Sequence, residues 1–249
     1  MSPKVAVLMC AHNSVLFIRE AIESILNQTY SDFEFIIVEN GSTDKTWEII
    51  NSYKDPRIRA FSTEIAQCSF NSNYGLLQTH ADFIAILDSD DIAKAERIER
   101  QVGYLEAHPE ISVLGTAIEV FHNNGTSKVI TLPLTDSEIR KKLPFVFSIG
   151  HPAVMFRRST IIDVGGYASG KCNLDFDLWL RLFRDKNIKF ANLSEPLLKY
   201  RIHPNQIKGS RESYATSAGM LLREALFRKS PRLFIASVLA CLKMFRATK

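Results

Sequence analysis

The sequence has no stretch of about 18 consecutive apolar residues, so it contains no conventional transmembrane helix. It also has no internal repeat and no low-complexity segment. Only four cysteines occur among 249 residues, and they form neither a Cys-x-x-Cys pair nor a zinc-binding spacing. This pattern predicts a reducing compartment in which cysteines serve as small apolar residues. They are Cys10, Cys68, Cys172 and Cys241.

A signal peptide is not expected either. The N-terminal region has only a short apolar run, Val5–Ala11, preceded by one lysine. His12-Asn13 follows at once, without the small-residue cleavage pattern of a secretory signal. We therefore expect this run to be a strand of a cytoplasmic protein.

The overall composition is that of an ordinary folded protein. Hydrophobic residues make up 46% of the chain, charged residues 23% and aromatic residues 10%, which argues against intrinsic disorder. A chain of 249 residues can bury a full core without disulfides or metals. The length predicts one large domain, or one domain with a small appendage.

The net charge of +4 hides an asymmetry between the body and the tail of the chain. Residues 206–249 hold nine Lys or Arg and two Glu, a net charge of +7, so residues 1–205 carry −3. A mildly acidic body argues against nucleic-acid binding, and a basic tail predicts an anionic partner for that segment.

Residues 1–110 alternate between strand and helix patterns. Continuous apolar runs at Val5–Met9, Phe33–Val38 and Phe83–Leu87 are typical of buried parallel strands, although Glu34 interrupts the second. Segments with apolar residues at helical spacing lie between or after them. This repeat predicts a Rossmann-like α/β fold, with a mostly parallel central sheet and helices on both faces.

The second half of the chain has a more mixed pattern. Residues Ile111–Pro133 alternate like strands around an Asn124-Gly125 turn. A short helix, a strand and another helix are expected at Ser137–Leu143, Ala153–Phe156 and Phe176–Asp185. Two basic helices, Ser210–Lys229 and Pro231–Arg246, are predicted to end the chain.

An acidic segment, Asp88-Ser89-Asp90-Asp91, directly follows the apolar run Phe83–Leu87. In open α/β sheets, ligands bind beyond the carboxyl ends of the strands. Three carboxylates in four residues repel one another unless a cation or hydrogen-bond donors offset their charge. Hard oxygen ligands suit Mg or Mn, which can also bind a diphosphate. The alternative is a solvated acidic turn that caps the next helix.

Two other polar segments follow predicted strands, Cys10–Asn13 and Val38–Asp44. Each by itself is explained as a strand-to-helix turn. Because the carboxyl ends of parallel strands share one edge of a sheet, all three polar segments should meet there. Together they predict a cleft for a nucleotide diphosphate.

Seven segments resemble, in order and at plausible spacing, the motifs of the family 2 glycosyltransferases, which are inverting enzymes of the GT-A fold. The resemblance covers about residues 4–207. The segments are Ala11-His12-Asn13, Ser24–Tyr30, Val38–Asp44, Asn73-Tyr74-Gly75, Leu87–Asp91, Asp175–Arg181 and Tyr200–Pro204.

The resemblance implies a role for each matching residue. Ala11, His12 and Glu39 are expected to line the nucleoside pocket, and Asp88 and Asp90 to contact the ribose and hold a divalent metal, Mn or Mg. The full set implied for the nucleotide-sugar is Ala11, His12, Glu39, Asn73, Asp88, Asp90 and His151, where His151 could instead be only a turn residue. The set implied for the metal is Asp90, Asp91 and His203.

Asp175 is implied as the general base. A sugar hydroxyl is a poor nucleophile until its proton can leave, so the reaction needs a group that accepts this proton. Without the resemblance, Asp175 would be interpreted as a helix N-cap. Asp177 is interpreted as a helix-surface residue or one that supports the site from behind, and Trp179 as a core residue.

Four positions depart from the family pattern. Glu39 and Asn40 replace two aspartates, Ser72 replaces an arginine, and Leu174 stands where the family often has glutamate. These changes leave the acidic segment and the implied base intact. They bear on the identity of the donor more than on activity.

The basic tail allows more than one interpretation. The apolar segment Leu233–Leu242 is too short to span a bilayer, and Arg228, Lys229, Arg232, Lys243 and Arg246 flank it. This pattern favours a helix lying on an anionic membrane surface. The same helix could instead pack on the domain or form a homodimer.

The sequence therefore predicts a glycosyltransferase domain at 1–207, with a nucleotide-binding half at about 1–110 and an acceptor half at about 111–207, followed by a helical tail at 208–249. It predicts inverting transfer from a nucleotide-sugar, with UDP-sugar preferred, to a saccharide or lipid-linked saccharide. The expected setting is polysaccharide or lipopolysaccharide synthesis at the inner face of the plasma membrane. One alternative, a nucleotidyltransferase-like enzyme, lacks support because no Gly-rich loop follows the first strand. The other is an inactive partner that binds nucleotide-sugar.

Overall fold

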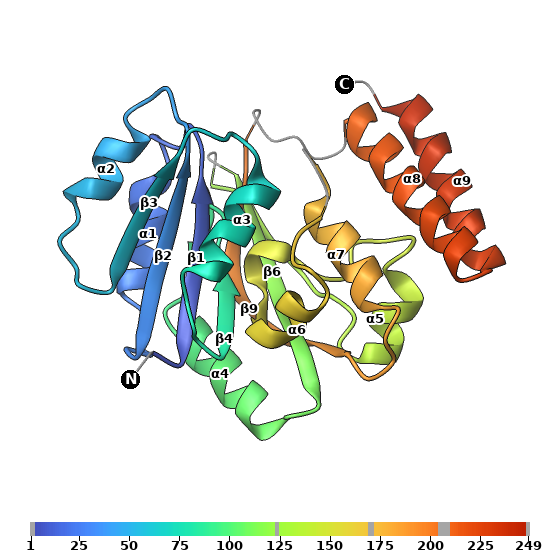
Figure 1. The fold of residues 1–249 in the computed structure, drawn as a ribbon, viewed down its shortest axis with the longest axis horizontal. Coiled ribbons are helices and arrows are strands. Elements are labelled where there is room, and N and C mark those ends of the chain that lie inside the picture. The colour runs from blue at the N-terminus through green and yellow to red at the C-terminus, as the bar shows by residue number, and fades with distance from the viewer. Residues whose placement is uncertain (1–2, 123–124, 169–171, 204–209, 248–249) are drawn as a thin grey trace.

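The structure is a computed structural model that describes residues 3–122, 125–168, 172–203 and 210–247. These residues form a central sheet of nine strands flanked by helices (Figure 1). The strand order is β3-β2-β1-β4-β8-β6-β9-β5, and β7 pairs with β6. The strands are β1 (Val5–Ala11), β2 (Phe33–Asn40), β3 (Ile58–Thr63), β4 (Phe83–Ile86), β5 (Ile92–Ala93), β6 (Ile111–His122), β7 (Ser127–Ile130), β8 (Met155–Arg157) and β9 (Lys189–Ile202). The helices are α1 (Ile18–Leu26), α2 (Thr46–Ser52), α3 (Cys68–Leu77), α4 (Arg97–Ala107), α5 (Asp136–Lys142), the 3-10 helix η1 (His151–Ala153), α6 (Arg158–Asp163), α7 (Leu174–Leu182), α8 (Arg211–Phe227) and α9 (Pro231–Arg246).

The strands β3, β2, β1 and β4 run parallel, and three of them, β2, β1 and β4, correspond to the predicted apolar runs. Helices cover both faces of this half. Ile22 of α1 and Ile98 of α4 belong to the core on one face, whereas Leu76 of α3 belongs to the core on the other. Both faces of β1, β2 and β4 are consequently buried, which explains why these strands are continuously apolar.

The other half of the sheet is mixed. β8 runs antiparallel to β4 and to β6, and β9 runs parallel to β6. The short β5 follows the acidic segment directly but pairs with β9 at the far end of the strand order. The sheet therefore curls, and the end of β9 returns to the turn that follows β4.

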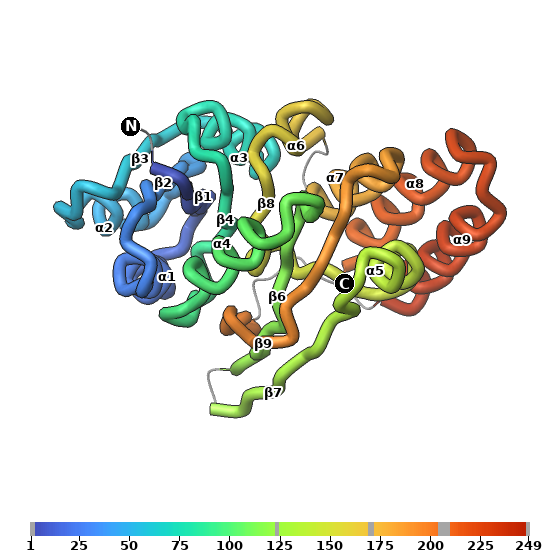
Figure 2. The backbone as a smooth tube through the Cα atoms, turned by 90° about the horizontal axis from the view of Figure 1, so that it is seen from below, coloured from blue at the N-terminus to red at the C-terminus, as the bar shows by residue number. Residues whose placement is uncertain are grey.

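The predicted hairpin in this half is present. β6 and β7 pair in antiparallel fashion and extend away from the helices (Figure 2). Asn124 of the predicted turn lies outside the described residues, and Gly125 has a φ of +85°, which favours glycine. The helix α6 was not predicted, because its six residues follow β8 without an intervening loop.

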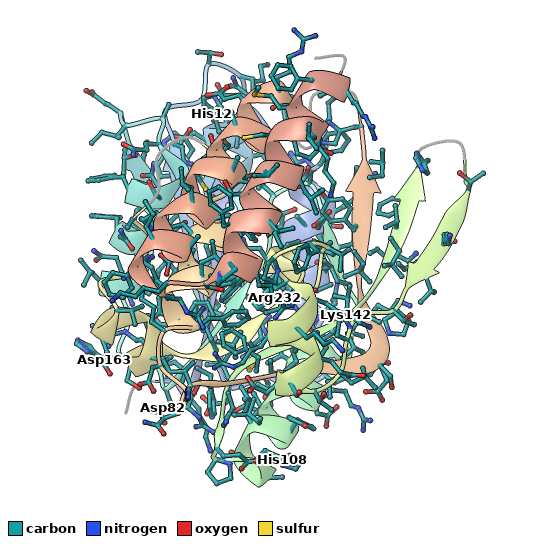
Figure 3. The ribbon with its side chains drawn as sticks, turned by 90° about the vertical axis from the view of Figure 1, so that its right-hand side faces the viewer. His12, Asp82, His108, Lys142, Asp163 and Arg232 are labelled. Carbon is teal, nitrogen blue, oxygen red and sulfur yellow. The ribbon has the colours of Figure 1, made fainter. Side chains whose placement is uncertain are left out.

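The two C-terminal helices form an antiparallel pair that lies beside α7 (Figure 1). Leu221, Leu233 and Ala236 join the same buried cluster as Leu178 of α7, so one side of the tail packs on the body of the protein. Arg232 of α9 also donates to the Lys141 carbonyl at the end of α5 (Figure 3). Packing on the domain, one of the alternatives left open by the sequence, is therefore present.

The opposite side of the tail is exposed and apolar. Phe245 is 75% exposed and Ile235 is 56% exposed, and both lie on α9. Within the part of the chain that the structure describes, no helix combines the length and apolar character needed to cross a bilayer. The exposed apolar residues of α9 are Phe234, Ile235, Val238, Leu239, Leu242 and Phe245.

Candidate active site at the carboxyl edge of the sheet

The acidic turn after β4 brings three carboxylates together. Ligand atoms of Asp88, Asp90 and Asp91 all lie within 4.8 Å of one another. Asp91 is fully buried, and its Oδ1 accepts a hydrogen bond from the Arg201 backbone N–H at 2.9 Å. Its other oxygen, Oδ2, is buried and has no hydrogen-bond partner among the described residues. The turn therefore contains one buried carboxylate oxygen that no described residue satisfies.

Burial and mutual repulsion make this cluster electrostatically unfavourable without a counter-charge. Burial raises the pKa of Asp88 well above its ordinary value, and the charge of Asp90 raises it further. Burial likewise raises the pKa of Asp91, with Asp88 and Asp90 adding to the effect. Arg97, which lies fully buried, supplies a nearby positive charge; burial lowers its pKa to about 10, and Asp91 and Asp88 oppose this shift.

Arg97 also fixes the strand ends next to the cluster. Its Nη2 donates to the Ile86 carbonyl at 2.7 Å and to the Val154 carbonyl at 3.1 Å, joining β4 to the chain before β8. Its Nε donates to Gln101 Oε1 at 3.1 Å. The cluster therefore rests on a hydrogen-bonded support rather than on a loose loop.

The returning end of β9 covers the acidic turn. His203 Nε2 lies 2.8 Å from Asp90 Oδ2, and the His203 ring stacks at a tilt on Phe17, with ring centroids 5.0 Å apart. Arg201 Nε donates to the Asp90 carbonyl at 2.9 Å, and its guanidinium pairs with Glu20 and lies 4.8 Å from the Phe17 ring centroid. His203 therefore sits beside the predicted metal ligands although it is distant from them in sequence.

The turns after β1 and β2 interlock beside this cluster. His12 Nδ1 donates to the Asn40 carbonyl at 2.9 Å, and Asn13 Oδ1 accepts from the Thr43 backbone N–H at 2.8 Å. Asn13 adopts a left-handed conformation with φ of +49°, which asparagine tolerates better than most residues. Ala11 pairs in register with Glu39, so the predicted nucleoside-binding residues come together at one edge.

Glu39 itself is engaged by its own turn. Ser42 donates its backbone N–H to Glu39 Oε1, and the Ser62 hydroxyl donates to Oε2 at 2.8 Å. Burial raises the pKa of Glu39, but the hydrogen bonds from Ser42 and Ser62 outweigh this effect, and the net pKa is lower than usual. The side chain is buried and already hydrogen-bonded at both oxygens, so it stabilises the turn after β2. It also lies at the predicted nucleoside pocket.

Asn73 is likewise held by the protein. Its Nδ2 donates to the Tyr167 carbonyl at 2.8 Å, and its Oδ1 accepts from the Tyr167 backbone N–H at 2.8 Å. A Cβ atom on Gly166 would collide with Asn73 Oδ1, and Gly166 has a φ of +67°. Asn73 therefore links α3 to the Gly165-Gly166 turn, and its predicted contact with the nucleotide-sugar stays a prediction.

A pocket of about 800 Å³ opens next to the acidic turn. Asp88 and Asp175 both line it, together with His151 and Trp179. His151 Nε2 lies 2.9 Å from the Tyr167 hydroxyl, and burial lowers the pKa of His151 while the Asp175 charge opposes this shift. Trp179 is buried as predicted, yet its indole N–H has no partner among the described residues.

The position of Asp175 depends on α8. Asn173, two residues before Asp175, has a φ of +56° and precedes α7. Its Nδ2 donates to the Ser213 carbonyl at 2.6 Å and to Ser217 Oγ at 2.8 Å, and its Oδ1 accepts from Ser213 Oγ at 2.9 Å. Sequence reasoning missed these residues, and only the asparagine before the predicted helix offered a local signal.

Asp177 has a structural role instead. It is buried, and its oxygens pair with Arg181 Nε at 2.8 Å and Arg223 Nη1 at 2.7 Å. The interpretation as a surface residue is therefore wrong, whereas support from behind the site agrees with its contacts. Arg223 also pairs with Glu224, which pairs with Arg184 at 2.6 Å, so a chain of ion pairs joins α7 to α8.

Comparison with known proteins identifies the family. The family model described as glycosyl transferase family 2 matches residues 6–165. The chain is 37% identical over 248 residues to the O-antigen biosynthesis glycosyltransferase WbnJ of Escherichia coli, covering 97% of this chain and 94% of that protein.

Solved structures establish the fold. The complex of S. aureus TarS 1-349 with UDP-GlcNAc has a TM-score of 0.72 at 18% identity, covering 88% of this chain and 66% of that chain. The mannosyltransferase PcManGT of Pyrobaculum calidifontis, solved with GDP-Man and Mn²⁺, has a TM-score of 0.65 at 15% identity, covering 99% of this chain and 74% of that chain. The chain thus spans just under two thirds of the TarS chain. The predicted GT-A fold is confirmed, and the chain belongs to glycosyl transferase family 2.

Proposed function

We propose that this glycosyltransferase moves a sugar from a nucleotide-sugar, preferentially a UDP-sugar, to a saccharide or lipid-linked saccharide, with inversion at the anomeric carbon. The observation that carries the proposal is that one pocket is lined both by Asp88 of the acidic turn and by Asp175. A donor diphosphate at the acidic turn and an acceptor at Asp175 would share this pocket. The similarity to WbnJ, whose name places it in O-antigen biosynthesis, supports a role in polysaccharide or lipopolysaccharide synthesis.

The acidic turn has the chemistry of a divalent-metal site. Asp88, Asp90 and Asp91 would hold the ion with His203 beside them, and the unpartnered buried Asp91 Oδ2 fits a cation ligand. Carboxylate oxygens suit Mg or Mn. When bound, such an ion stabilises the negative charge that develops on a leaving diphosphate.

The remaining roles belong to side chains of the protein. Ala11, His12, Glu39 and Asn73 would shape the nucleoside side of the cleft. Asp175 would accept the proton of the attacking acceptor hydroxyl, for which its place in the pocket is suitable. His151, whose lowered pKa favours the neutral ring, would serve as a hydrogen-bonding group rather than as a second charge.

An inactive partner that binds nucleotide-sugar remains the second candidate function, since the same cleft would bind a donor without turnover. Asp175 in the shared pocket favours the enzyme.

We also propose the division into a domain at 1–207, with halves at about 1–110 and 111–207, and a tail at 208–249. The exposed apolar row of α9 and its basic neighbours support a cytoplasmic protein that binds the inner face of the plasma membrane; a homodimer through the same row is the alternative.

A thermal-shift panel of nucleotide-sugars, each with and without Mn, tests the proposal. A ligand that binds only the folded state raises the melting temperature, and a UDP-sugar should do so most when Mn is present. Asp90→Ala should remove the increment due to Mn while the protein stays folded. Equal stabilisation with and without metal in the unmodified protein would refute the metal site, and no stabilisation by any nucleotide-sugar would refute the function.

A further inference from the structure

The C-terminal helices form one wall of the pocket that contains Asp175. Leu239, Leu242, Lys243 and Arg246 of α9 and Tyr214 of α8 line it. All of them lie beyond the region matched by the family model, which ends at residue 165. The pocket is therefore completed by residues of the C-terminal helices, which also lie beyond the seven family motifs.

Two cations of this wall have no carboxylate partner among the described residues. Lys243 Nζ donates only to the Phe145 carbonyl, at 3.4 Å, and Arg246 enters no ion pair there. By contrast, Arg223 on the same helix pair is bound to both Asp177 and Glu224. Cations that line a pocket without a counter-charge favour an anionic ligand.

The same wall is also apolar and opens to the surface. Leu239 and Leu242 line the pocket, yet they are 43% and 52% exposed, because they belong to the exposed row of α9. Phe145 and Phe147 also line the pocket and extend its apolar lining. An apolar path therefore leads from the pocket onto the outer face of α9.

Three kinds of chemistry thus meet around this pocket. Asp88, which follows β4, and Asp175 of α7 offer carboxylates to a sugar. On the side of the tail, Lys243 and Arg246 offer cations, and the α9 leucines offer an apolar surface. A ligand that satisfies all three must carry a sugar, an anionic group and a hydrocarbon in one molecule.

We infer that the acceptor is an amphiphilic glycosyl phosphate or diphosphate, and that Lys243 and Arg246 bind its phosphate. This inference rests on the proposed function. The acceptor sugar lies at Asp175, the phosphate lies between the two cations, and the hydrocarbon follows Leu239 and Leu242 to the exposed face of α9. Lys243 and Arg246 are therefore specificity-determining residues of the acceptor site.

The test measures binding of decyl diphosphate, below its micelle concentration and without membranes, by calorimetry. The unmodified protein is compared with Lys243→Ala/Arg246→Ala and with the matched control Arg228→Ala/Lys229→Ala. The control removes the same charge from the same helix pair, at the turn between α8 and α9, where neither residue lines the pocket. Decanol and inorganic pyrophosphate test the apolar and anionic parts of the probe separately.

We expect Lys243→Ala/Arg246→Ala to weaken binding of decyl diphosphate about 10- to 100-fold, the effect of losing charge-assisted contacts. The affinity of the control variant for decyl diphosphate should stay within about twofold of that of the unmodified protein. Decanol and pyrophosphate should each bind more weakly than decyl diphosphate. Equal binding of decyl diphosphate by both double variants, or equal binding of decanol and decyl diphosphate, would overturn the inference.

Vesicles that contain phosphatidylglycerol distinguish the other source of phosphate. If Lys243→Ala/Arg246→Ala loses vesicle binding but keeps decyl diphosphate binding, the cations bind lipid headgroups and the inference is wrong. Stabilisation by nucleotide-sugar with Mn is measured on the same samples. If that stabilisation persists while the acceptor probe fails, only this inference falls; if it is absent from the unmodified protein, the proposed function falls as well.

Discussion

The proposed donor edge and the proposed acceptor pocket, which belong to one cleft, are built in different ways. The donor edge consists of three short segments, Cys10–Asn13, Val38–Asp44 and Asp88–Asp91, at the carboxyl ends of the buried parallel strands β1, β2 and β4. The acceptor pocket is lined by residues of η1, α7, α8 and α9, and the packing of the tail on the body holds these helices together. Damage to the tail should therefore impair transfer before it impairs donor binding.

The largest expected effect concerns Asp175. Asp175→Asn keeps the size of the side chain but removes the carboxylate that we propose as the proton acceptor, so turnover should fall about 10²- to 10⁴-fold. Donor affinity should hardly change, because the lost interaction belongs to the transition state. Steady-state kinetics and nucleotide-sugar binding measure the two quantities separately. Near-normal turnover in Asp175→Asn would mean that the base lies elsewhere.

Asp177, on the same helix, should behave in the opposite way. Asp177→Asn leaves Arg181 and Arg223 without their shared buried counter-charge, which should lower the free energy of unfolding by about 3 kcal/mol. Urea unfolding measures this loss. Turnover per folded molecule should stay close to normal, and a large loss of turnover with unchanged stability would exchange the roles of the two aspartates.

The difference between these two residues shows what the sequence could predict. The donor edge could be predicted from the sequence because the residues of each segment are contiguous and the strands before them are apolar on both faces. A local pattern was therefore enough to place Asp88, Asp90 and Asp91 at a strand end. Asp175 and Asp177 have the same residue type and nearly the same sequence position. Asp177 differs in being buried between Arg181 of its own helix and Arg223 of α8, and no local pattern contains the contact with Arg223.

The sheet shows the same limit. The parallel half follows from repeated strand and helix patterns, whereas the antiparallel insertion of β8 between β4 and β6 depends on pairings between distant segments. The basic helices α8 and α9 were predicted at nearly the observed bounds. Their packing on α7 was only one of several alternatives, because an amphipathic helix can bury its apolar side against a protein or a membrane.

A smaller effect is expected at Asn173, which joins the acceptor pocket to α8. Asn173→Ala removes three hydrogen bonds and places alanine in a left-handed conformation, so the free energy of unfolding should fall by about 1–3 kcal/mol. Turnover should also fall, while nucleotide-sugar binding stays intact. Asn173→Gly is the matched control, since glycine keeps the backbone conformation without the hydrogen bonds. Weaker donor binding in both variants would contradict the separation of the two sides.

The smallest effect concerns pH and the ion pairs between α7 and α8. Burial raises the pKa of Glu224, but its bonds to Arg184 and Arg223 outweigh burial, and the net pKa in the folded protein lies below the ordinary value of 4.5. Between the folded and unfolded pKa values the unfolded chain binds more protons, so stability rises with pH there. The stabilisation by Glu224 is therefore complete above about pH 4.5 and is lost as pH falls through the folded pKa.

Glu224→Gln removes this titration, so its free energy of unfolding should depend less on pH in that acidic window than that of the unmodified protein. The comparison uses urea unfolding at several pH values, with Glu212→Gln as control because Glu212 lies on the exposed first turn of the same helix.

Since Glu224 holds α8 on α7, the acceptor pocket should open on acidification before the donor edge does. Hydrogen exchange would show this as earlier loss of protection in α8 than in β1 and β2. Simultaneous loss in all three elements would show that the tail and the sheet unfold as one unit.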